Sequence, residues 1–319
     1  MVVIRYILIA FSGILLLSCG NDDGVSTSAD GNIQAWLDST SISASRDDAT
    51  GIYYYADSLN PSGAQVSSGS VAAIYYTLSD LNGNVIASHQ RNNGDSLIFK
   101  VGASAVYPLG VDRGVTFMRV GEIYNFILPP EQAYQDLTSG AINPNLIAHL
   151  EIQVVGVHAE SDLFAQDITA IDDYITTNNL NDTVTNPLNR VEQFSASGIS
   201  YKRLSAGSGA LPLNGDTIIV DYNGRFLDDS SFGSETGFEW IYGSNDPREL
   251  LVGFEFGVSL MQTGERALIM IPSSQAYRES ALVIPDFISN DLVEDDIIPD
   301  YVTSIPPYHP LLFEITRVD

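Results

Sequence analysis

The chain has 319 residues, of which 45% are hydrophobic, and its 40 acidic and 14 basic residues give a formal net charge of −26. This composition suits one large folded domain or two ordinary ones, and not a disordered polyelectrolyte. Such a charge, with no basic run, repels phosphate backbones and excludes nucleic acid as a partner. A single cysteine excludes a disulfide scaffold, a Cys-ligated zinc site and an iron–sulfur cluster.

The first twenty residues have the features of an export signal. One basic residue, Arg5, precedes a twelve-residue apolar stretch from Tyr6 to Leu17, and small residues follow it. The stretch is too short to span a bilayer and is typical of a secretory signal peptide, which we place at residues 1–18. A buried core helix is the alternative, but the stretch has no amphipathic period.

Residues 16–20, LLSCG, resemble a bacterial lipobox, in which the cysteine becomes the first residue of the mature protein and is acylated. The resemblance implies that Cys19 is the lipid attachment point, with an ordinary cleaved signal as the alternative. Residues 19–31 are then expected to be a lipidated cysteine and a flexible polar tether. The Asn21-Asp22-Asp23 cluster resembles the export tag of surface-displayed lipoproteins in the Bacteroidetes group, although a solvated linker is an equal alternative.

The rest of the chain contains an internal repeat. Residues 114–134 (GVTFMRVGEIYNFILPPEQAY) and 257–277 (GVSLMQTGERALIMIPSSQAY) are identical at nine of 21 positions, where average residue usage predicts about one. The shared frame is G-V-x-x-M-x-x-G-E followed by P-x-x-Q-A-Y. We interpret Gly121 and Gly264 as turn glycines. Glu122 and Glu265 are expected to be solvated or paired at the start of a strand.

Matching elements surround the repeated frame. Alternating residues predict strands at Val71 to Thr77 and Thr217 to Asn223, and LEIQVVGV near residue 150 and LLFEITRV near residue 311 close the two copies. Apolar residues at helical spacing predict a short helix before each copy, at Ile33, Trp36 and Leu37 and at Phe164, Ile168, Ile171 and Ile175. We therefore expect two antiparallel α+β domains, residues 32–160 and 161–319, rather than one continuous enzyme with a single cleft.

Both copies resemble the FKBP-type peptidyl-prolyl isomerase domain. The second copy has GDTIIVDYNGRF, FEWIYG, the repeated frame and IPPYHPLLFEI in the order of that family, and the resemblance covers residues 50–157 and 197–319. It implies two tandem domains, each a curved antiparallel sheet wrapped around one short helix. It also implies isomerisation of prolyl amides without a nucleophile, a metal or a cofactor. The barrier of about 18–20 kcal/mol falls when an apolar, water-poor pocket favours the twisted amide over the planar one.

The resemblance assigns roles to nine residues of the second copy. It implies that Tyr277 donates a hydrogen bond to a substrate carbonyl and that Phe254 stands at the floor of the pocket, where the family usually has tryptophan. The expected catalytic residues are Tyr222, Phe232, Phe238, Phe254 and Tyr277, and the expected substrate-binding residues are Leu250, Leu251, Ile305 and Phe313.

Two features of the second copy depart from the family. The pocket aspartate that follows the phenylalanine is replaced by Gly233, while Asp228 and Asp229 lie on the other side of Phe232. An inserted loop near 279–303 is about twenty residues longer than its counterpart in the first copy and contains the acidic run 294–296. In the family this loop flanks the pocket.

The first copy retains fewer of the pocket residues. Tyr76 and Tyr134 persist, whereas the other positions are occupied by Ile86, Ala87, Val111 and Ile142-Asn143-Pro144. A pocket with so little aromatic surface is expected to hold a proline ring poorly. We interpret the first domain as a structural or binding copy with little isomerase activity.

Other chemistries have no support in the sequence. The histidines His89, His149, His158 and His309 have neither metal spacing nor a partner motif, and no G-x-S-x-G elbow is present. Asp80 to Asn84 begins like a calcium loop, but position twelve would be Arg91, so we expect a hairpin turn.

The sequence thus predicts a lipoprotein of the cell envelope, anchored to the outer membrane through Cys19. Its second domain is expected to isomerise prolyl-containing exported polypeptides and to assist their folding. The alternative is a non-catalytic FKBP-like binding module or chaperone on the envelope, with the acidic loop as its contact surface.

Overall fold

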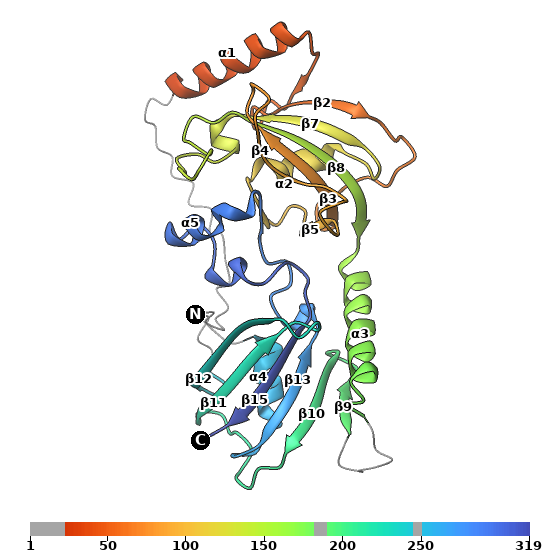
Figure 1. Ribbon diagram of the computed structural model, residues 1–319, viewed down its shortest axis with the longest axis vertical. Helices are drawn as coiled ribbons and strands as arrows, with labels where there is room; N and C mark the ends of the chain where they lie inside the picture. Colours follow the sequence, from red (N-terminus) through yellow and green to blue (C-terminus); the bar gives the residue numbers. More distant parts are fainter. Residues whose placement is uncertain (1–22, 182–189, 245–250) are drawn as a thin grey trace. The chain divides into compact units, whose positions relative to one another are not determined.

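The computed structural model describes residues 23–181, 190–244 and 251–319. They form two compact units, which we call the first domain (23–160 with 281–298) and the second domain (the described parts of 161–280, with 299–319) (Figure 1). The predicted signal peptide, Cys19 and Leu250 lie outside the described residues. Among the described helices, none combines the length and the apolar character needed to cross a membrane.

The first domain is built on a seven-stranded sheet with the order β1-β2-β7-β8-β3-β4, in which β5 also pairs with β3. All pairs in this sheet are antiparallel. Its strands are β1 (Ser45–Arg46), β2 (Tyr53–Ser58), β3 (Val71–Ser79), β4 (Val85–His89), β5 (Leu97–Lys100), β7 (Ile123–Leu128) and β8 (Ala148–His158). The other elements before residue 160 are α1 (Asp23–Thr40), β6 (Val106–Tyr107), α2 (Gly110–Gly114), η1 (Val115–Phe117) and η2 (Pro130–Gln132). The inserted segment adds β14 (Leu282–Val283), η4 (Asp286–Ile288) and α5 (Ser289–Glu294).

The second domain has a six-stranded antiparallel sheet with the order β12-β11-β15-β13-β10-β9. Its elements are α3 (Glu160–Thr177), β9 (Val191–Phe194), β10 (Ile199–Ser205), β11 (Thr217–Arg225), β12 (Ser231–Ile241), α4 (Val252–Ser259), β13 (Arg266–Ile271), η3 (Ser273–Gln275), η5 (Asp300–Thr303) and β15 (Leu311–Arg317). Strands β10, β13, β15 and β11 follow one another as β2, β7, β8 and β3 do in the first domain. The predicted α+β class with two antiparallel domains is confirmed.

Burial along the strands follows the position of each strand in its sheet. In β11 the buried residues alternate, as predicted, with Ile218, Val220 and Tyr222 on one face. In β3 the predicted alternation is wrong, because nearly every residue from Val71 to Ser79 is buried. This strand pairs with β8 on one side and with both β4 and β5 on the other. The predicted hairpin turn at 80–84 joins β3 to β4, and the Asp80 carboxylate accepts the N–H groups of Asn82 and Asn84.

The repeated frame forms a helix, a turn and the start of a strand in both domains. The first glycine of the frame lets the helix approach the strand, since a Cβ on Gly257 would lie 2.2 Å from the Ile269 side chain and one on Gly114 would lie 2.9 Å from Phe126. The second glycine is the predicted turn glycine, with φ of +89° at Gly121 and +81° at Gly264.

The glutamate of the frame is buried in both domains. Of the two expected environments, solvent exposure is therefore excluded, and the glutamate is instead paired with hydrogen-bond donors. Glu122 accepts the backbone N–H groups of Arg119 (2.7 Å) and Asn60 (3.0 Å). Glu265 accepts the backbone N–H of Gln262 (3.2 Å), the Arg203 guanidinium (2.7 Å) and the Tyr201 hydroxyl.

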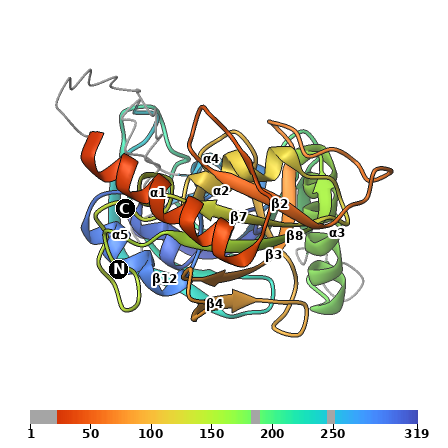
Figure 2. The same cartoon turned by 90° about the horizontal axis from the view of Figure 1, so that it is seen from above.

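Helix α1 corrects the predicted extent of the tether. It begins at Asp23, so residues 23–31, which we expected to be flexible, are helical. Ala29, Ile33 and Leu37 follow one another at intervals of four and are buried, as an apolar helix face requires. The Asp30 carboxylate accepts a hydrogen bond from the Tyr53 hydroxyl at 2.9 Å. These contacts hold the helix on the sheet, and Figure 2 shows α1 crossing the strands of the first domain.

A half-buried histidine supports the same helix. The His149 ring meets the Trp36 ring edge-on at 5.4 Å between centroids, and its Nε2 lies 2.8 Å from the amide oxygen of Asn125. The Asn125 amide in turn donates to Asp57. Burial lowers the pKa of His149 below its ordinary value of 6.5, although the Asp57 charge acts in the opposite direction.

We expect this histidine to make the first domain less stable in mild acid. Its pKa is lower in the folded state than the value of about 6.5 in the unfolded state, so the unfolded state binds the proton more readily. The stabilisation is therefore complete above about pH 6.5, decreases as the pH falls below it, and levels off below the folded pKa. Urea unfolding at several pH values, followed by Trp36 fluorescence in a Trp240→Phe background, measures the effect. The His149→Gln variant should show a smaller decrease, and an identical pH dependence in both proteins would contradict the assignment.

Candidate functional site

The predicted site residues of the second copy that the structure describes all belong to one buried cluster. They come from the neighbouring strands β11 and β12, from α4 and the residue before it, from the loop after β13, from the segment between η5 and β15, and from β15. Each is at most 8% exposed. The members are Tyr222, Phe232, Phe238, Leu251, Phe254, Tyr277, Ile305 and Phe313. We call this set the aromatic cluster. Its composition makes a dry, apolar environment of the kind that the sequence led us to expect.

Tyr222 stands at the centre of the aromatic cluster. Its ring lies 5.8 Å from Phe238, 5.7 Å from Phe254 and 6.0 Å from Phe313 between centroids, with interplanar angles of 89°, 81° and 68°. Such edge-to-face pairs are the favoured geometry of aromatic rings in a core. Phe232 joins the cluster through Phe313 at 5.5 Å. The rings thus form one continuous apolar cluster.

Two contacts hold the loop that carries Tyr277. On one side, the Asp167 carboxylate of α3 accepts the Ser273 backbone N–H at 2.8 Å and also its hydroxyl. On the other side, the Tyr301 ring stacks on the Tyr277 ring at 4.3 Å between centroids. Burial raises the pKa of Asp167, and the hydrogen bonds from Ser273 partly offset that effect. The sequence analysis missed Asp167, although it lies four residues after Leu163 and four before Ile171 on the buried face of α3.

A carboxylate reaches Tyr222 even though the aspartate position is Gly233. Val220 lies opposite Phe238, but Tyr222 lies opposite Glu235, so β12 has one extra residue between these pairs. This bulge places Glu235 and Phe238 on the same face of the sheet as Tyr222. Burial, and then the charge and hydrogen bond of Glu235, raise the pKa of Tyr222 well above its ordinary value of 10. Glu235 therefore supplies a carboxylate two residues beyond Gly233.

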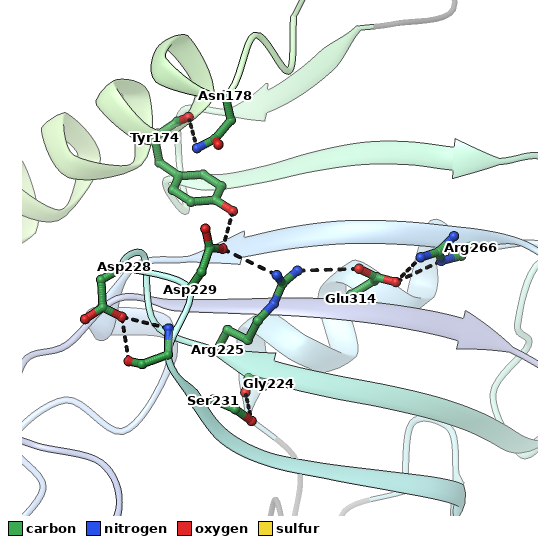
Figure 3. Close-up of polar contacts among 10 residues, drawn as sticks. Tyr174, Asn178, Gly224, Arg225, Asp228, Asp229, Ser231, Arg266 and Glu314 are labelled. Carbon is green, nitrogen blue, oxygen red and sulfur yellow. Dashed lines mark hydrogen bonds and ion pairs between the residues drawn. The ribbon is translucent and has the colours of Figure 1, made fainter.

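The aspartates before Phe232 have other partners. Figure 3 shows Asp229 accepting the Tyr174 hydroxyl at 2.9 Å and pairing with Arg225, which also pairs with Glu314. Asp228 accepts the backbone N–H of Ser230. Neither aspartate belongs to the aromatic cluster.

Two further aromatic residues border the cluster. Trp240 lies 5.5 Å from Phe238 and 6.0 Å from Phe254, and Tyr301 packs against Tyr277. Trp240 could have been found from the sequence, since it follows Phe238 by two positions on a strand and so shares its face. Tyr301 lies inside the insertion, where no pattern marks it.

The inserted loop does not stay with the second domain. We expected residues near 279–303 to be an inserted loop of the second domain, but residues 281–298 belong to the compact unit of the first domain. The physical reason is apolar burial, because this segment contains five aliphatic side chains that are at most 7% exposed: Leu282, Val283, Ile284, Ile288 and Leu292. Only the two ends of the loop, including Tyr301, remain with the second domain.

The first copy keeps its two tyrosines inside the domain. Tyr76 and Tyr134 are 5% and 1% exposed, and Val111 is equally buried. Ile86 and Ala87 lie half-buried on the edge strand β4. Ile142 is buried, while Asn143 and Pro144 are exposed. The described residues contain no group of three or more histidine, cysteine or acidic side chains placed to hold a metal ion.

The fold and the aromatic cluster define a tandem pair of antiparallel α+β domains, one of which has a dry aromatic site with a tyrosine on the adjoining loop. The family model described as FKBP-type peptidyl-prolyl cis-trans isomerase matches residues 63–155 and 209–317. The chain therefore belongs to the FKBP-type peptidyl-prolyl cis-trans isomerase family.

Curated relatives are similar over part of their length. The probable FKBP-type peptidyl-prolyl cis-trans isomerase FkpA of Neisseria meningitidis serogroup B is 35% identical over 86 residues, 26% of this chain and 30% of that protein. The outer membrane protein MIP of Legionella longbeachae is 31% identical over 81 residues, 25% of this chain and 34% of that protein. FK506-binding protein 1B of Emericella nidulans is 30% identical over 103 residues, 28% of this chain and 86% of that protein. The matches to FkpA and MIP thus span about a third of those two proteins.

We expect Glu235 to stabilise the second domain through Tyr222. Glu235→Ala should lower the free energy of unfolding by about 1–3 kcal/mol, because the buried Tyr222 hydroxyl loses a charged acceptor. The matched control is Glu239→Ala, an exposed glutamate on the same strand, which should change it by less than about 0.5 kcal/mol. In a double-mutant cycle with Tyr222→Phe, the combined loss should be smaller than the sum of the single losses. Additive losses would contradict the pairing.

Proposed function

We propose that the second domain catalyses cis–trans isomerisation of prolyl bonds in exported polypeptides and so assists their folding. The observation that carries the proposal is the aromatic cluster, in which the rings of Tyr222, Phe238 and Phe254 meet edge to face beside Tyr277. Membership of the family supports the reaction class.

Rotation about a prolyl amide bond requires little from the protein beyond an apolar, water-poor environment. Rotation about the prolyl C–N bond removes its resonance, so the carbonyl of the twisted amide is less polarised than that of the planar one. A dry aromatic wall therefore destabilises the planar amide relative to the twisted one. The hydroxyl of Tyr277 is proposed to donate to a substrate carbonyl and to orient the peptide. Glu235 is proposed to act as a positioning residue, because it contacts Tyr222 and not the substrate.

We expect removal of single groups from this site to slow isomerisation. In a prolyl-peptide assay on the mature chain, Tyr277→Phe should lower kcat/KM about 2- to 10-fold, the equivalent of one lost hydrogen bond. Phe238→Leu should lower it as well, because the wall loses an aromatic face. Tyr174→Phe is the matched control, since it removes a tyrosine hydroxyl of the same domain that bonds to Asp229 outside the cluster. No acceleration over buffer by the wild-type chain would refute the enzymatic proposal and favour a non-catalytic chaperone.

The proposed location is the cell envelope, with an acylated Cys19 as the anchor to the outer membrane. The LLSCG sequence after a short apolar stretch supports it. The name of the Legionella relative, outer membrane protein MIP, agrees with such a location. More than one acyl chain is needed for stable anchoring, which a diacylglyceryl cysteine supplies.

The anchor can be tested directly in a bacterial host that makes lipoproteins. We expect the wild-type chain to incorporate labelled palmitate and to lose residues 1–18, as mass spectrometry of the mature amino terminus would show. The Cys19→Ser variant should keep its signal peptide and remain unlabelled. Labelling of that variant would contradict Cys19 as the attachment point.

A further inference from the structure

The inserted segment 281–298 is an element of the first domain although its neighbours in sequence belong to the second. The chain leaves the second domain after Ser280 and returns to it at Pro299. Between these points Ile284, Ile288 and Leu292 are fully buried. The segment therefore has a defined place in the first domain and is more than a surface loop.

Backbone hydrogen bonds join the segment to the first domain as an added strand. Strand β14 pairs in parallel with β6, with Leu282 opposite Val106 and Val283 opposite Tyr107. The Leu282 N–H donates to the Ala105 carbonyl at 2.9 Å, and the Ile284 N–H donates to the Tyr107 carbonyl at 2.8 Å. Strand addition of this kind is a common way for a domain to bind an extended peptide.

The side chain that completes the contact is the repeated tyrosine of the first domain. The Tyr134 hydroxyl donates to the Ile284 carbonyl at 2.9 Å, and Tyr134 is 1% exposed. Burial raises the pKa of Tyr134 well above its ordinary value of 10, so the hydroxyl keeps its proton and remains a donor at neutral pH. By the internal repeat, Tyr134 is the counterpart of Tyr277.

The carbonyl that accepts this hydrogen bond belongs to a prolyl amide. Ile284 is followed by Pro285, which is buried. Both backbone polar groups of Ile284 are therefore satisfied by the first domain, its N–H by Tyr107 and its C=O by Tyr134. The Ile284-Pro285 unit thus makes the hydrogen bonds with the first domain that a bound peptide would make.

The residues after the proline extend the contact. The Phe287 ring lies over Gly140, since a Cβ on this glycine would be 3.6 Å from it. Burial, with a smaller effect of the Asp286 charge, raises the pKa of Tyr76 to about 12. Burial and the Asp295 charge do the same for Tyr107. The charges of Asp286 and Asp295 in the inserted loop thus act on tyrosines of the first domain.

We propose that the first domain is a binding site for an extended peptide with aliphatic residues before proline and an aromatic residue after it, and that residues 282–288 of the same chain occupy this site. The occupant is intramolecular, so its effective concentration at the site is on the order of millimolar. An external peptide of equal intrinsic affinity must reach about that concentration to displace it. The first domain is thereby closed to other prolyl peptides while the segment is in place.

This inference does not depend on the proposed isomerase activity of the second domain. It concerns binding at the first domain, and its test measures the binding of a peptide and no turnover. An inactive second domain would leave it unchanged.

The test uses a fluorescein-labelled peptide with the sequence of residues 280–289, SALVIPDFIS, and the mature full-length chain. Fluorescence anisotropy compares the wild type with an emptied variant in which residues 282–288 are replaced by a Gly-Ser segment of equal length. We expect saturable binding to the emptied variant and none to the wild type at micromolar concentrations. Adding Tyr134→Phe to the emptied variant should weaken binding about 2- to 10-fold, the value of one hydrogen bond. Tyr174→Phe is the matched control and should not change the affinity, because its hydroxyl bonds to Asp229 outside both proposed sites.

Two results would overturn the proposal: equal binding to the wild type and the emptied variant, or no binding to an emptied variant whose circular dichroism is that of a folded protein. Hydrogen exchange covers the case in which the emptied variant does not fold. In the otherwise unaltered chain, Tyr134→Phe should speed exchange of the Leu282 and Ile284 amides several-fold, while the amides of β8 keep their protection. Unchanged exchange at these two amides would also refute it.

Discussion

Both domains depend on a carboxylate buried at the start of a central strand. Glu122 and Glu265 each accept the backbone N–H of the residue three positions earlier, and each has further donors from other parts of its domain. A carboxylate away from water is costly unless its oxygens are hydrogen-bonded, so the turn that precedes the strand has little freedom. That turn joins the short helix to the strand, and Met118 and Met261, three residues before the turn glycines, are fully buried.

The position of each candidate site follows from this turn. In the second domain the helix reaches the strand closely enough to need Gly257, and Phe254 is then directed into the aromatic cluster. The strand that begins at the turn, β13, leads directly into the loop with Tyr277. One buried acid thus holds the turn between the helix that carries Phe254 and the strand that leads to Tyr277. This explains why the glutamate persists in both copies while the pocket residues of the first copy have changed.

Much of the fold could be predicted because the repeated frame combines hydrophobic period with glycines whose conformation has few alternatives. The cluster of Tyr222, Phe238 and Phe254 could be placed from family resemblance, and the structure brings these rings together. Glu235 could not, because a single extra residue in β12 changes which side chains face Tyr222, and a bulge leaves no mark in an alternating pattern. Nor could the place of residues 281–298, since an apolar run shows that a segment is buried but not against which domain.

The two tyrosines of the repeat illustrate how one donor can serve two purposes. A tyrosine hydroxyl in a dry site needs an acceptor, and a buried backbone carbonyl is a suitable one. In the first domain Tyr134 finds this acceptor in Ile284, within its own chain. Because the segment and the site belong to the same chain, most of the entropic cost of bringing them together is removed. Even a site with few aromatic residues therefore holds its peptide. A catalytic site has the opposite requirement, since a ligand bound so persistently would exclude every substrate. The two domains meet these two requirements separately. Residues 281–298 supply the first domain with a permanent ligand, whereas the two ends of the inserted loop stay with the second domain, which contains Tyr277.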